Sequence, residues 1–349
     1  MTGYEAHCVP FSVVLEGSLL YFESDSSDAA FHFSVEDYIA NNTSSTEPIL
    51  MFWRTDKTVM LGNYQIPHAE IDIEYASKEG IKVVRRSSGG GAIFTDLGTI
   101  LISMIVPETG VQYPLQAAKE TLVELVVSAL NEIGLPVKPE GRNDIALYGK
   151  KVSGIAQYAR NGRICSHCSL LHNTDLEMLS RVLKVDEGKI QSKAIRSVRS
   201  RVTNLAEHMA TPLSTVEFLS LLKRHVFNER DIGEYILPEK APEGITGIYN
   251  EKYGCNEWTY GMSPRFSLKH SKRFTGGNLD VFLDITDGKI ISCSIRGDYL
   301  GTEPISGLEE LLIGSCLQYN NIEGLLQGVE LYPYLGSITK EQFLSCLFG

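Results

Sequence analysis

The segment Arg85-Arg86-Ser87-Ser88-Gly89-Gly90-Gly91 most constrains what this chain can fold into. A β-rich run leads into the two arginines, and a further apolar run, Ala92-Ile93-Phe94, follows the three glycines. Glycine lacks Cβ, so successive main-chain N–H groups can approach a ligand closely and form an anion-binding concavity. Arginine adds a fixed fork of donors for phosphate or carboxylate. The segment therefore predicts an anion site. The alternative is a flexible hairpin with solvated arginines.

The sequence lacks the commoner nucleotide-binding loops. Gly141 and Gly149 precede Lys150-Lys151 at the wrong spacing for G-x-x-x-x-G-K-[ST], and no G-x-G-x-x-G lies near the three glycines.

The formal net charge of −11 argues against a general nucleic-acid surface. An acidic chain that binds an anion must gather its cations locally. This chain does so at Arg85-Arg86, at Arg142 with Lys150-Lys151, and at 193–201.

A second candidate site combines Asn143-Asp144 with the lysine pair that follows it. Asn143 and Asp144, at a strand start, can offer hard oxygens to Mg²⁺, which prefers few protein ligands plus substrate phosphates. Lys151, on the neighbouring strand, can neutralise an α-phosphate and hold a carboxylate. Adenylation needs this combination because metal and cation share the charge that develops as pyrophosphate leaves. The alternative is a turn whose polar side chains bond their own backbone.

Two further segments leave alternatives open. Cys165-Ser166-His167-Cys168 has only His172 close by in the sequence, whereas a structural zinc site usually needs two such pairs. A reactive thiol at Cys168 is the better alternative, because a neighbouring imidazole could lower its pKa. The run 189–201 carries five cations and is either a solvated basic face or a mobile segment that folds over a nucleotide.

Helices and strands interleave along the chain. Apolar residues at three- and four-residue steps, with Pro114 at the start and Gly134 just past the end, predict a helix over 115–133. Capping boxes that begin at Thr174, Ser214, Ser306 and Thr339 predict four more helix starts. Short β-rich runs predict strands at 49–53, 58–61, 81–85, 99–106, 144–148, 152–158, 279–285 and 289–295. The last two flank Asp287-Gly288, which predicts a type I′ turn.

The order of these elements predicts an α+β fold. Several strands follow one another directly, so the sheet should be at least partly antiparallel. The length of 349 residues suggests two domains. The Pro- and Gly-rich stretch 237–261 is predicted to connect them. We expect a catalytic domain at 1–243, a linker at 244–261 and a small α/β domain at 262–349; the first 20 or so residues match nothing.

The chain is expected to be a cytoplasmic monomer that binds no membrane. No apolar run approaches the ~18–20 residues needed to cross a bilayer, and the N-terminus lacks the features of a signal peptide. Seven cysteines are an odd count spread through the chain, so a disulfide framework is not expected. The sequence contains no repeated heptads, so self-association through a coiled coil is not expected.

In their order along the chain, these motifs resemble those of the lipoate–protein ligase A family. The matching stretches are Phe33-Ser34-Val35-Glu36, Phe52-Trp53 with Leu61-Gly62, then 85–96, 141–157, 166–175 and 193–204. Glu257-Trp258, Gly261 and Ser263-Pro264 look like the join to the family's small accessory domain. Any one motif is only suggestive, but the ordered set is specific.

The resemblance implies a catalytic domain similar to biotin ligases and class II synthetases, with a mixed, largely antiparallel sheet and helices around it. It implies that Lys151 is catalytic and contacts both the lipoate carboxylate and the α-phosphate. The implied nucleotide site comprises Arg86, Gly91, Ala92, Ile93, Phe94, Asn143, Asp144 and Lys151, with Asp144 beside Mg²⁺. The implied lipoate site comprises Trp53, Ser88, Gly90, Gly91, Lys151 and His167. The segment 186–196 would close on the adenylate.

Three positions depart from the family's pattern. Thr95 stands where the family usually has His, Cys168 where it usually has Gly, and His172 where an apolar residue is usual. The last two are expected to bear on the acyl pocket, so they leave the preference between lipoate and octanoate open.

Three functions compete at this stage. The first is an ATP- and Mg²⁺-dependent ligase that forms lipoyl-AMP and lipoylates a lysine of a lipoyl-domain acceptor, such as a 2-oxoacid dehydrogenase E2 subunit or a glycine-cleavage H protein. Lys151 would act there as an electrostatic clamp and not as a covalent nucleophile. The second is a cofactor-free octanoyl or lipoyl transferase that uses Cys168 as a thioester-forming nucleophile. The third is a non-enzymatic lipoate- or nucleotide-responsive module. The stretch 193–204 and the C-terminal domain favour the ligase.

Overall fold

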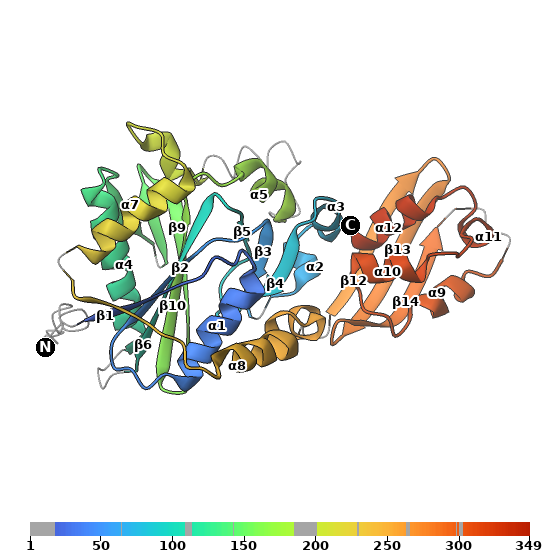
Figure 1. Ribbon diagram of the computed structural model, residues 1–349. Coiled ribbons are helices and arrows are strands. Elements are labelled where there is room, and N and C mark those ends of the chain that lie inside the picture. Colours follow the sequence, from blue (N-terminus) through green and yellow to red (C-terminus); the bar gives the residue numbers. More distant parts are fainter. Residues whose placement is uncertain are drawn as a thin grey trace, which may run out of the picture.

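The computed structural model describes residues 18–63, 65–108, 114–141, 143–184, 201–228, 230–262, 266–297, 299 and 303–349. A larger part is built around an eight-stranded sheet, and a smaller C-terminal part, orange to red in Figure 1, lies beside it. Within the described ranges, no helix is both long and apolar enough to span a membrane.

The central sheet has the strand order β11-β1-β2-β6-β10-β9-β8-β7. Its strands are β1 (Leu19–Glu23), β2 (Ile49–Trp53), β6 (Thr99–Pro107), β7 (Val137–Glu140), β8 (Asp144–Leu147), β9 (Lys150–Arg160), β10 (Arg163–Leu171) and β11 (Ile232–Glu234). β1 pairs in parallel with β2 and β11, and the remaining neighbours are antiparallel. The predicted mixed, largely antiparallel sheet is therefore confirmed.

A second, three-stranded sheet carries the Gly-rich segment. It consists of β3 (Thr58–Leu61), β4 (Lys82–Arg85) and β5 (Ile93–Thr95), with β3 in the middle, parallel to β4 and antiparallel to β5. The two arginines and three glycines fall at the end of β4 and in the turn that leads to β5. The small sheet thus holds this turn at both ends.

Helices cover both faces of the central sheet (Figure 1). The helices of the larger part are α1 (Ala29–Asn42), α2 (Pro67–Glu70), α3 (Ile73–Lys78), α4 (Pro114–Glu132), α5 (Leu176–Val182), α7 (Thr215–Phe227) and α8 (Ala241–Ile248), with a 3₁₀ turn, η2, at Leu205–His208; of these, α2, α3 and α5 lie beside the small sheet. The apolar stripes of α4 and α7 pack on one face of the sheet. α1 and α8 pack on the other. Because α8 also covers α1, most of α1 is buried, including Glu36 and Asp37.

Two of the four predicted capping boxes are confirmed, at Ser214 and Thr339. The prediction at Thr174 is off by one residue, because Asp175 caps α5 instead. The fourth is wrong: Ser306 is the first residue of a helix that has no side-chain cap.

The stretch predicted to connect two domains is mostly helical. After α8 come two π-helical turns, η3 (Tyr249–Tyr253) and η4 (Glu257–Gly261). We call residues 249–261 the connector. Pro242 is tolerated in α8 because it lies in the first turn, where a backbone donor has no helical partner. Gly244 lets α8 approach α1, since a Cβ there would lie 2.5 Å from the Tyr38 ring.

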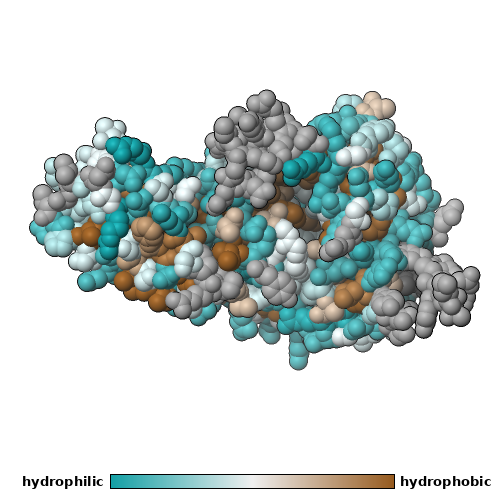
Figure 2. All heavy atoms as spheres, turned by 180° about the vertical axis from the view of Figure 1, so that it is seen from behind, coloured by the Kyte–Doolittle hydropathy of each residue, from teal (hydrophilic) through white to brown (hydrophobic). Residues whose placement is uncertain are grey.

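The C-terminal part is an antiparallel sheet covered by helices. Its elements are β12 (Phe266–Phe274), β13 (Gly277–Thr286), β14 (Lys289–Gly297), α9 (Ser306–Leu312), α10 (Tyr319–Leu325), α11 (Tyr332–Leu335) and α12 (Lys340–Phe348). Asp287 and Gly288 both have positive φ, 51° and 71°, so the predicted hairpin turn is confirmed. The core of this part continues into the larger part through Val59, Leu61 and Ile71. Figure 2, seen from behind, shows hydrophobic residues gathered on the C-terminal part, at the left.

Candidate active site

Arg85 anchors the start of the Gly-rich turn. Its side chain is fully buried and donates hydrogen bonds of 2.7–3.1 Å to five main-chain carbonyls, those of Gly62, Asn63, Gln65, Trp258 and Thr259. In return, Trp258 Nε1 donates to the Arg85 carbonyl at 2.8 Å. Burial lowers the pKa of Arg85 to about 10, which leaves it charged at neutral pH. Arg85 therefore joins β4 to the connector instead of facing a ligand.

Arg86 shapes the turn itself. Its guanidinium donates to the carbonyls of Met60, Gly89 and Gly91 at 2.8–2.9 Å and to Ser88 Oγ at 3.0 Å. Gly90 has φ +97°, a conformation that favours glycine. The carbonyls of the turn point towards the guanidinium. A direct bond from Arg86 to a phosphate, as the sequence analysis expected, would have to replace one of these contacts.

A buried polar chain leads inward from Ser88. Ser88 Oγ lies 2.7 Å from His167 Nε2, and His167 Nδ1 lies 3.3 Å from Glu36 Oε1. The other oxygen of Glu36 accepts from Ser103 Oγ at 3.0 Å, and Ser103 Oγ accepts from Trp53 Nε1 at 3.1 Å. These side chains are all buried. The chain fixes the orientation of the His167 and Trp53 rings, because each ring nitrogen has a defined partner.

Lys151 and Asp144 form an ion pair on adjacent strands. Lys151 Nζ lies 2.7 Å from Asp144 Oδ1, and both side chains are about two-fifths exposed. The pairing register between β8 and β9 shifts between Ile145 and Ala146. Gly154 lies directly against the pair, since a Cβ there would be 3.1 Å from Lys151 Nζ. The amine is thus held at the mouth of a pocket, where an incoming anion can reach it.

These features meet in one cavity of about 240 Å³. It is lined by the predicted residues Trp53, Arg86, Gly90, Gly91, Ala92, Ile93, Asn143, Asp144, Lys151 and His167. One end holds the Lys151 and Asp144 pair beside the turn. The rest of the wall is largely apolar, with Phe33, Met60, Leu101 and Ile155. A polar mouth and an apolar interior suit an amphiphile whose acidic end is activated.

Two of the expected site residues do not line this cavity. Phe94 is buried in the apolar cluster below the small sheet, because neighbouring residues on a strand point to opposite sides and Ile93 takes the cavity side. Ser88 acts one step behind the wall, through His167.

Two of the noted departures also lie away from the cavity. Thr95 bonds Thr55 at 2.7 Å inside the core. His172 stacks on Phe218 and contacts Thr215, so the expectation that it bears on the acyl pocket is not met.

The buried position of Cys168 does not favour the alternative of a reactive thiol there. His167 and Cys168 are consecutive on β10, so their side chains point to opposite faces of the sheet. Cys168 borders the cavity, but its side chain packs in the apolar cluster under α4 and α7. Burial raises the pKa of the Cys168 thiol to about 12. The same alternation keeps Cys165, His167 and Cys168 from converging on one zinc ion.

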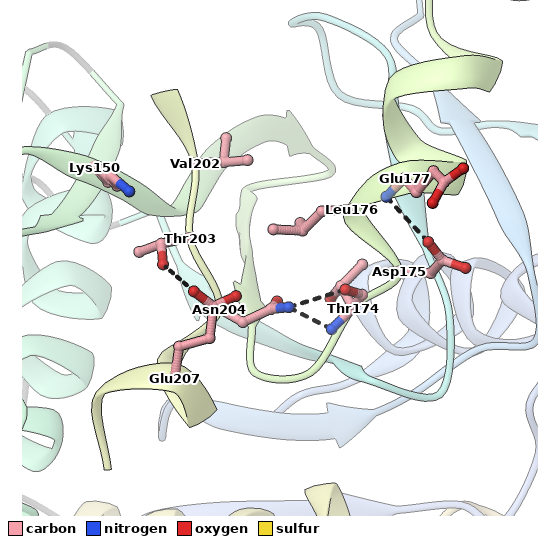
Figure 3. A pocket seen from close by; sticks show the side chains of 9 residues that line it. All are labelled: Lys150, Thr174, Asp175, Leu176, Glu177, Val202, Thr203, Asn204 and Glu207. Atoms are coloured by element: carbon pink, nitrogen blue, oxygen red, sulfur yellow. Dashed lines mark hydrogen bonds between the residues drawn. The ribbon is translucent and has the colours of Figure 1, made fainter. Parts of the chain in front are cut away.

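A second cavity, of about 540 Å³, is lined by residues 202–204 and by the start of α5 (Figure 3). In it, the Asn204 amide bonds the main chain of Thr174 in both directions, at 2.9 and 3.0 Å. Its ionisable lining is Lys150, Asp175, Glu177 and Glu207. Three carboxylates against one amine disfavour a polyphosphate there.

The metal expectation rests on Asp144 alone. In the part of the chain that the structure describes, no three His, Cys, Asp or Glu side chains come together as a metal site. One carboxylate beside Asn143 still fits Mg²⁺, which is often held by one or two carboxylates and by substrate phosphates.

The predicted closing segment, 186–196, lies outside the described residues.

Sequence reasoning missed several residues that organise the site. Glu36 and Ser103 hold His167, and Gly154 makes room for the ion pair. Glu36 lies in one of the matched stretches, 33–36, but neither spacing nor chemistry pointed to its role. Ser103 had no signal at all, because it is one residue within a continuous apolar strand.

Comparisons with known proteins match both parts of the chain. Residues 28–227 match the lipoyl protein ligase A/B catalytic domain, and residues 263–347 match the bacterial lipoate protein ligase C-terminus. The lipoate-protein ligase LplJ of Bacillus subtilis is 39% identical over 92% of this chain and 97% of its own length.

Two solved structures share the fold of the larger part. One is a bipartite lipoate protein ligase from Thermoplasma acidophilum, described with its E2 lipoyl domain. It is 31% identical with a TM-score of 0.62, over 71% of this chain and 97% of that one. The other is a lipoate-protein ligase A bound with ATP. It is 30% identical with a TM-score of 0.61, over 71% of this chain and all of that one.

Proposed function

Because the chain belongs to the lipoate–protein ligase family of enzymes, we propose that it activates lipoate with ATP and transfers the lipoyl group to a lysine of an acceptor protein. A carboxylate oxygen of lipoate attacks the α-phosphorus of ATP, and pyrophosphate leaves. The acceptor amine then attacks the carbonyl carbon of lipoyl-AMP, loses a proton, and AMP departs. The products are AMP, pyrophosphate and an amide.

The observation that carries this proposal is the position of Lys151. Its ammonium pairs with Asp144, and Lys151 lines the same largely apolar cavity as Gly90 and Gly91 of the turn. There it can neutralise both the lipoate carboxylate and the α-phosphate, and it is most useful where charge builds up in the transition state. We assign the acyl chain to the interior beside Trp53 and His167, and the nucleotide to the mouth beside Gly91, Asn143 and Asp144.

Asp144 and Asn143 would hold Mg²⁺ together with the phosphates of ATP. The ion, when bound, shares the charge of the leaving pyrophosphate. Asp144 would then exchange part of its contact with Lys151 for the metal, which frees the amine for the substrate.

The acceptor is proposed to be a lipoyl domain. The Thermoplasma ligase is described with its E2 lipoyl domain, and E2 subunits and the H protein carry such domains. We further propose the division into a catalytic domain at 1–243, a linker at 244–261 and an accessory domain at 262–349. A cytoplasmic location and a monomeric state stay predictions.

The direct test is pyrophosphate release from lipoate and MgATP without an acceptor. We expect release that depends on lipoate, with hydroxylamine added to trap the mixed anhydride and allow turnover. Formation of lipohydroxamate should match the pyrophosphate released. No release with either lipoate or octanoate would contradict the proposal and favour a binding module.

The transferase that uses Cys168 remains the second candidate, and a Cys168→Ser variant separates the two. Under the ligase proposal we expect pyrophosphate release within about threefold of wild type, because the thiol is buried, protonated and turned away from His167. The measurement is the rate of release, combined with intact-protein mass after incubation with an octanoyl thioester. Loss of transfer in the variant, with an acyl adduct on Cys168 in the wild type, would support the transferase instead.

A further inference from the structure

Asp37 is a buried carboxylate that the proposed chemistry does not use. It follows Glu36 on α1, and its side chain is only 2% exposed. Two cations contact its Oδ2: Lys252 Nζ at 2.8 Å and Arg160 at 3.1 Å. Lys252 belongs to the connector, 215 residues further along the chain. A buried carboxylate with two cationic partners is a fixed anchor, because leaving it unpaired would be costly.

Lys252 also reaches the Gly-rich turn. Its ammonium donates to Ser87 Oγ at 2.8 Å, and Ser87 Oγ lies 2.6 Å from the Tyr253 hydroxyl. The Tyr253 and Trp258 rings each lie 4.6 Å from the ammonium, at a distance suited to cation–π contact. This amine is therefore held by a carboxylate, a hydroxyl and two aromatic rings, and its side chain is only 17% exposed. It does not act as a loose surface lysine.

The two serines of the turn are held in matching ways. Ser88 contacts His167, which contacts Glu36. Ser87 contacts Lys252, which contacts Asp37. Consecutive carboxylates on α1 thus fix consecutive serines on the turn, each through one basic side chain. The basic residue of the first link, His167, lies in the cavity wall, whereas that of the second, Lys252, lies in the connector.

We propose that Lys252 is a positioning residue for the adenylation reaction, and that it holds the Gly-rich turn in its ligand-binding shape through Ser87. This inference rests on the proposed function, since it assumes that the turn binds MgATP and lipoate. Through Lys252, the connector would help to hold the active site in shape. Only two residues separate Ser87 from Gly90 in the cavity wall, so movement of Ser87 is passed to the wall.

The test compares four variants in the full-length protein: Lys252→Met, Lys252→Arg, Ser87→Ala and Arg160→Met. The assay is pyrophosphate release with hydroxylamine as trap. We expect Lys252→Met to raise the KM for MgATP about tenfold with kcat within about twofold, because a displaced turn weakens ground state and transition state alike. Lys252→Arg, which can still donate to both partners, should recover most of the loss. Ser87→Ala should raise the KM in the same direction, and combining it with Lys252→Met should add little.

Arg160→Met is the matched control. It removes the other cation from Asp37 but has no contact with Ser87. We expect its KM for MgATP to stay within about twofold of wild type, whatever its melting temperature. Equal KM changes in Arg160→Met and Lys252→Met would overturn the inference, because the effect would then come from Asp37 alone. An unchanged KM in Ser87→Ala would also overturn it, and this variant serves if Lys252→Met does not fold. If the wild-type protein itself releases no pyrophosphate, the proposed function is refuted instead.

Discussion

Replacing Lys151 with alanine is expected to lower the rate of lipoyl-AMP formation by about a thousandfold, by analogy with the loss of a preorganised group that stabilises transition-state charge. The loss should appear mainly in kcat, because the ammonium meets its largest negative charge when pyrophosphate leaves. The fold should persist, since the side chain is two-fifths exposed and its partner Asp144 is exposed to the same degree. Trapped lipohydroxamate and circular dichroism measure the two effects.

The neighbouring lysine provides the control. Lys150 lies next to Lys151 on β9 but faces the second cavity. Lys150→Ala makes the same change in net charge one residue away, and its rate should stay within about threefold of wild type. If Lys151→Ala forms the adenylate at a near-normal rate, or if both variants lose activity equally, the assignment of Lys151 as the clamp is wrong.

Replacing Arg85 with methionine is expected to destabilise the protein by about 4 kcal/mol. The substitution keeps the apolar volume but removes the donors to five main-chain carbonyls, of which those of Gly62 and Thr259 are in buried contacts, and each buried group left unsatisfied costs about 1–3 kcal/mol. These carbonyls belong to the loop after β3 and to the connector, so both should loosen together. Urea unfolding followed by tryptophan fluorescence measures this loss, since Trp258 bonds the Arg85 carbonyl.

Arg181→Met is the comparison for that change. Arg181 is 44% exposed and pairs with Glu177, one helical turn away. Exposed pairs of this kind contribute about 0.3–0.5 kcal/mol, so its unfolding midpoint should barely move. A midpoint for Arg85→Met close to that of Arg181→Met would refute the anchoring role of Arg85.

The parts of the fold that the sequence predicted are those with local signals. β2 and β3 appear at their predicted bounds, because short apolar runs next to turn residues decide strand formation locally. The helix α4 follows its apolar stripe and begins at Pro114. The predicted linking stretch 237–261 was not foreseen as helical, because its prolines and glycines read as breaks. Only the packing of Gly244 on Tyr38 explains why glycine belongs in a helix there.

The candidate site was predictable up to the point where tertiary contacts decide. The Gly-rich turn, Asn143, Asp144 and Lys151 share a cavity, as their chemistry suggested. Arg85 and Arg86 look equivalent in the sequence, yet one ties the connector and the other shapes the turn. Nor could sequence spacing link Lys252 with Ser87 or His167 with Glu36, since 165 and 131 residues separate these pairs.

The Arg85 contacts also bear on how the protein is made. The Thr259 carbonyl that accepts from Arg85 lies 174 residues downstream. Synthesis proceeds from the N-terminus at about 5–20 residues per second, so roughly 10–35 s pass on the ribosome between these two residues. During that interval the nascent chain holds an arginine whose last two acceptors do not yet exist. The contacts of Arg85 with the connector can therefore form only after the connector has been translated. A chain truncated before residue 258 lacks both acceptors, so its Gly-rich turn is never fully anchored.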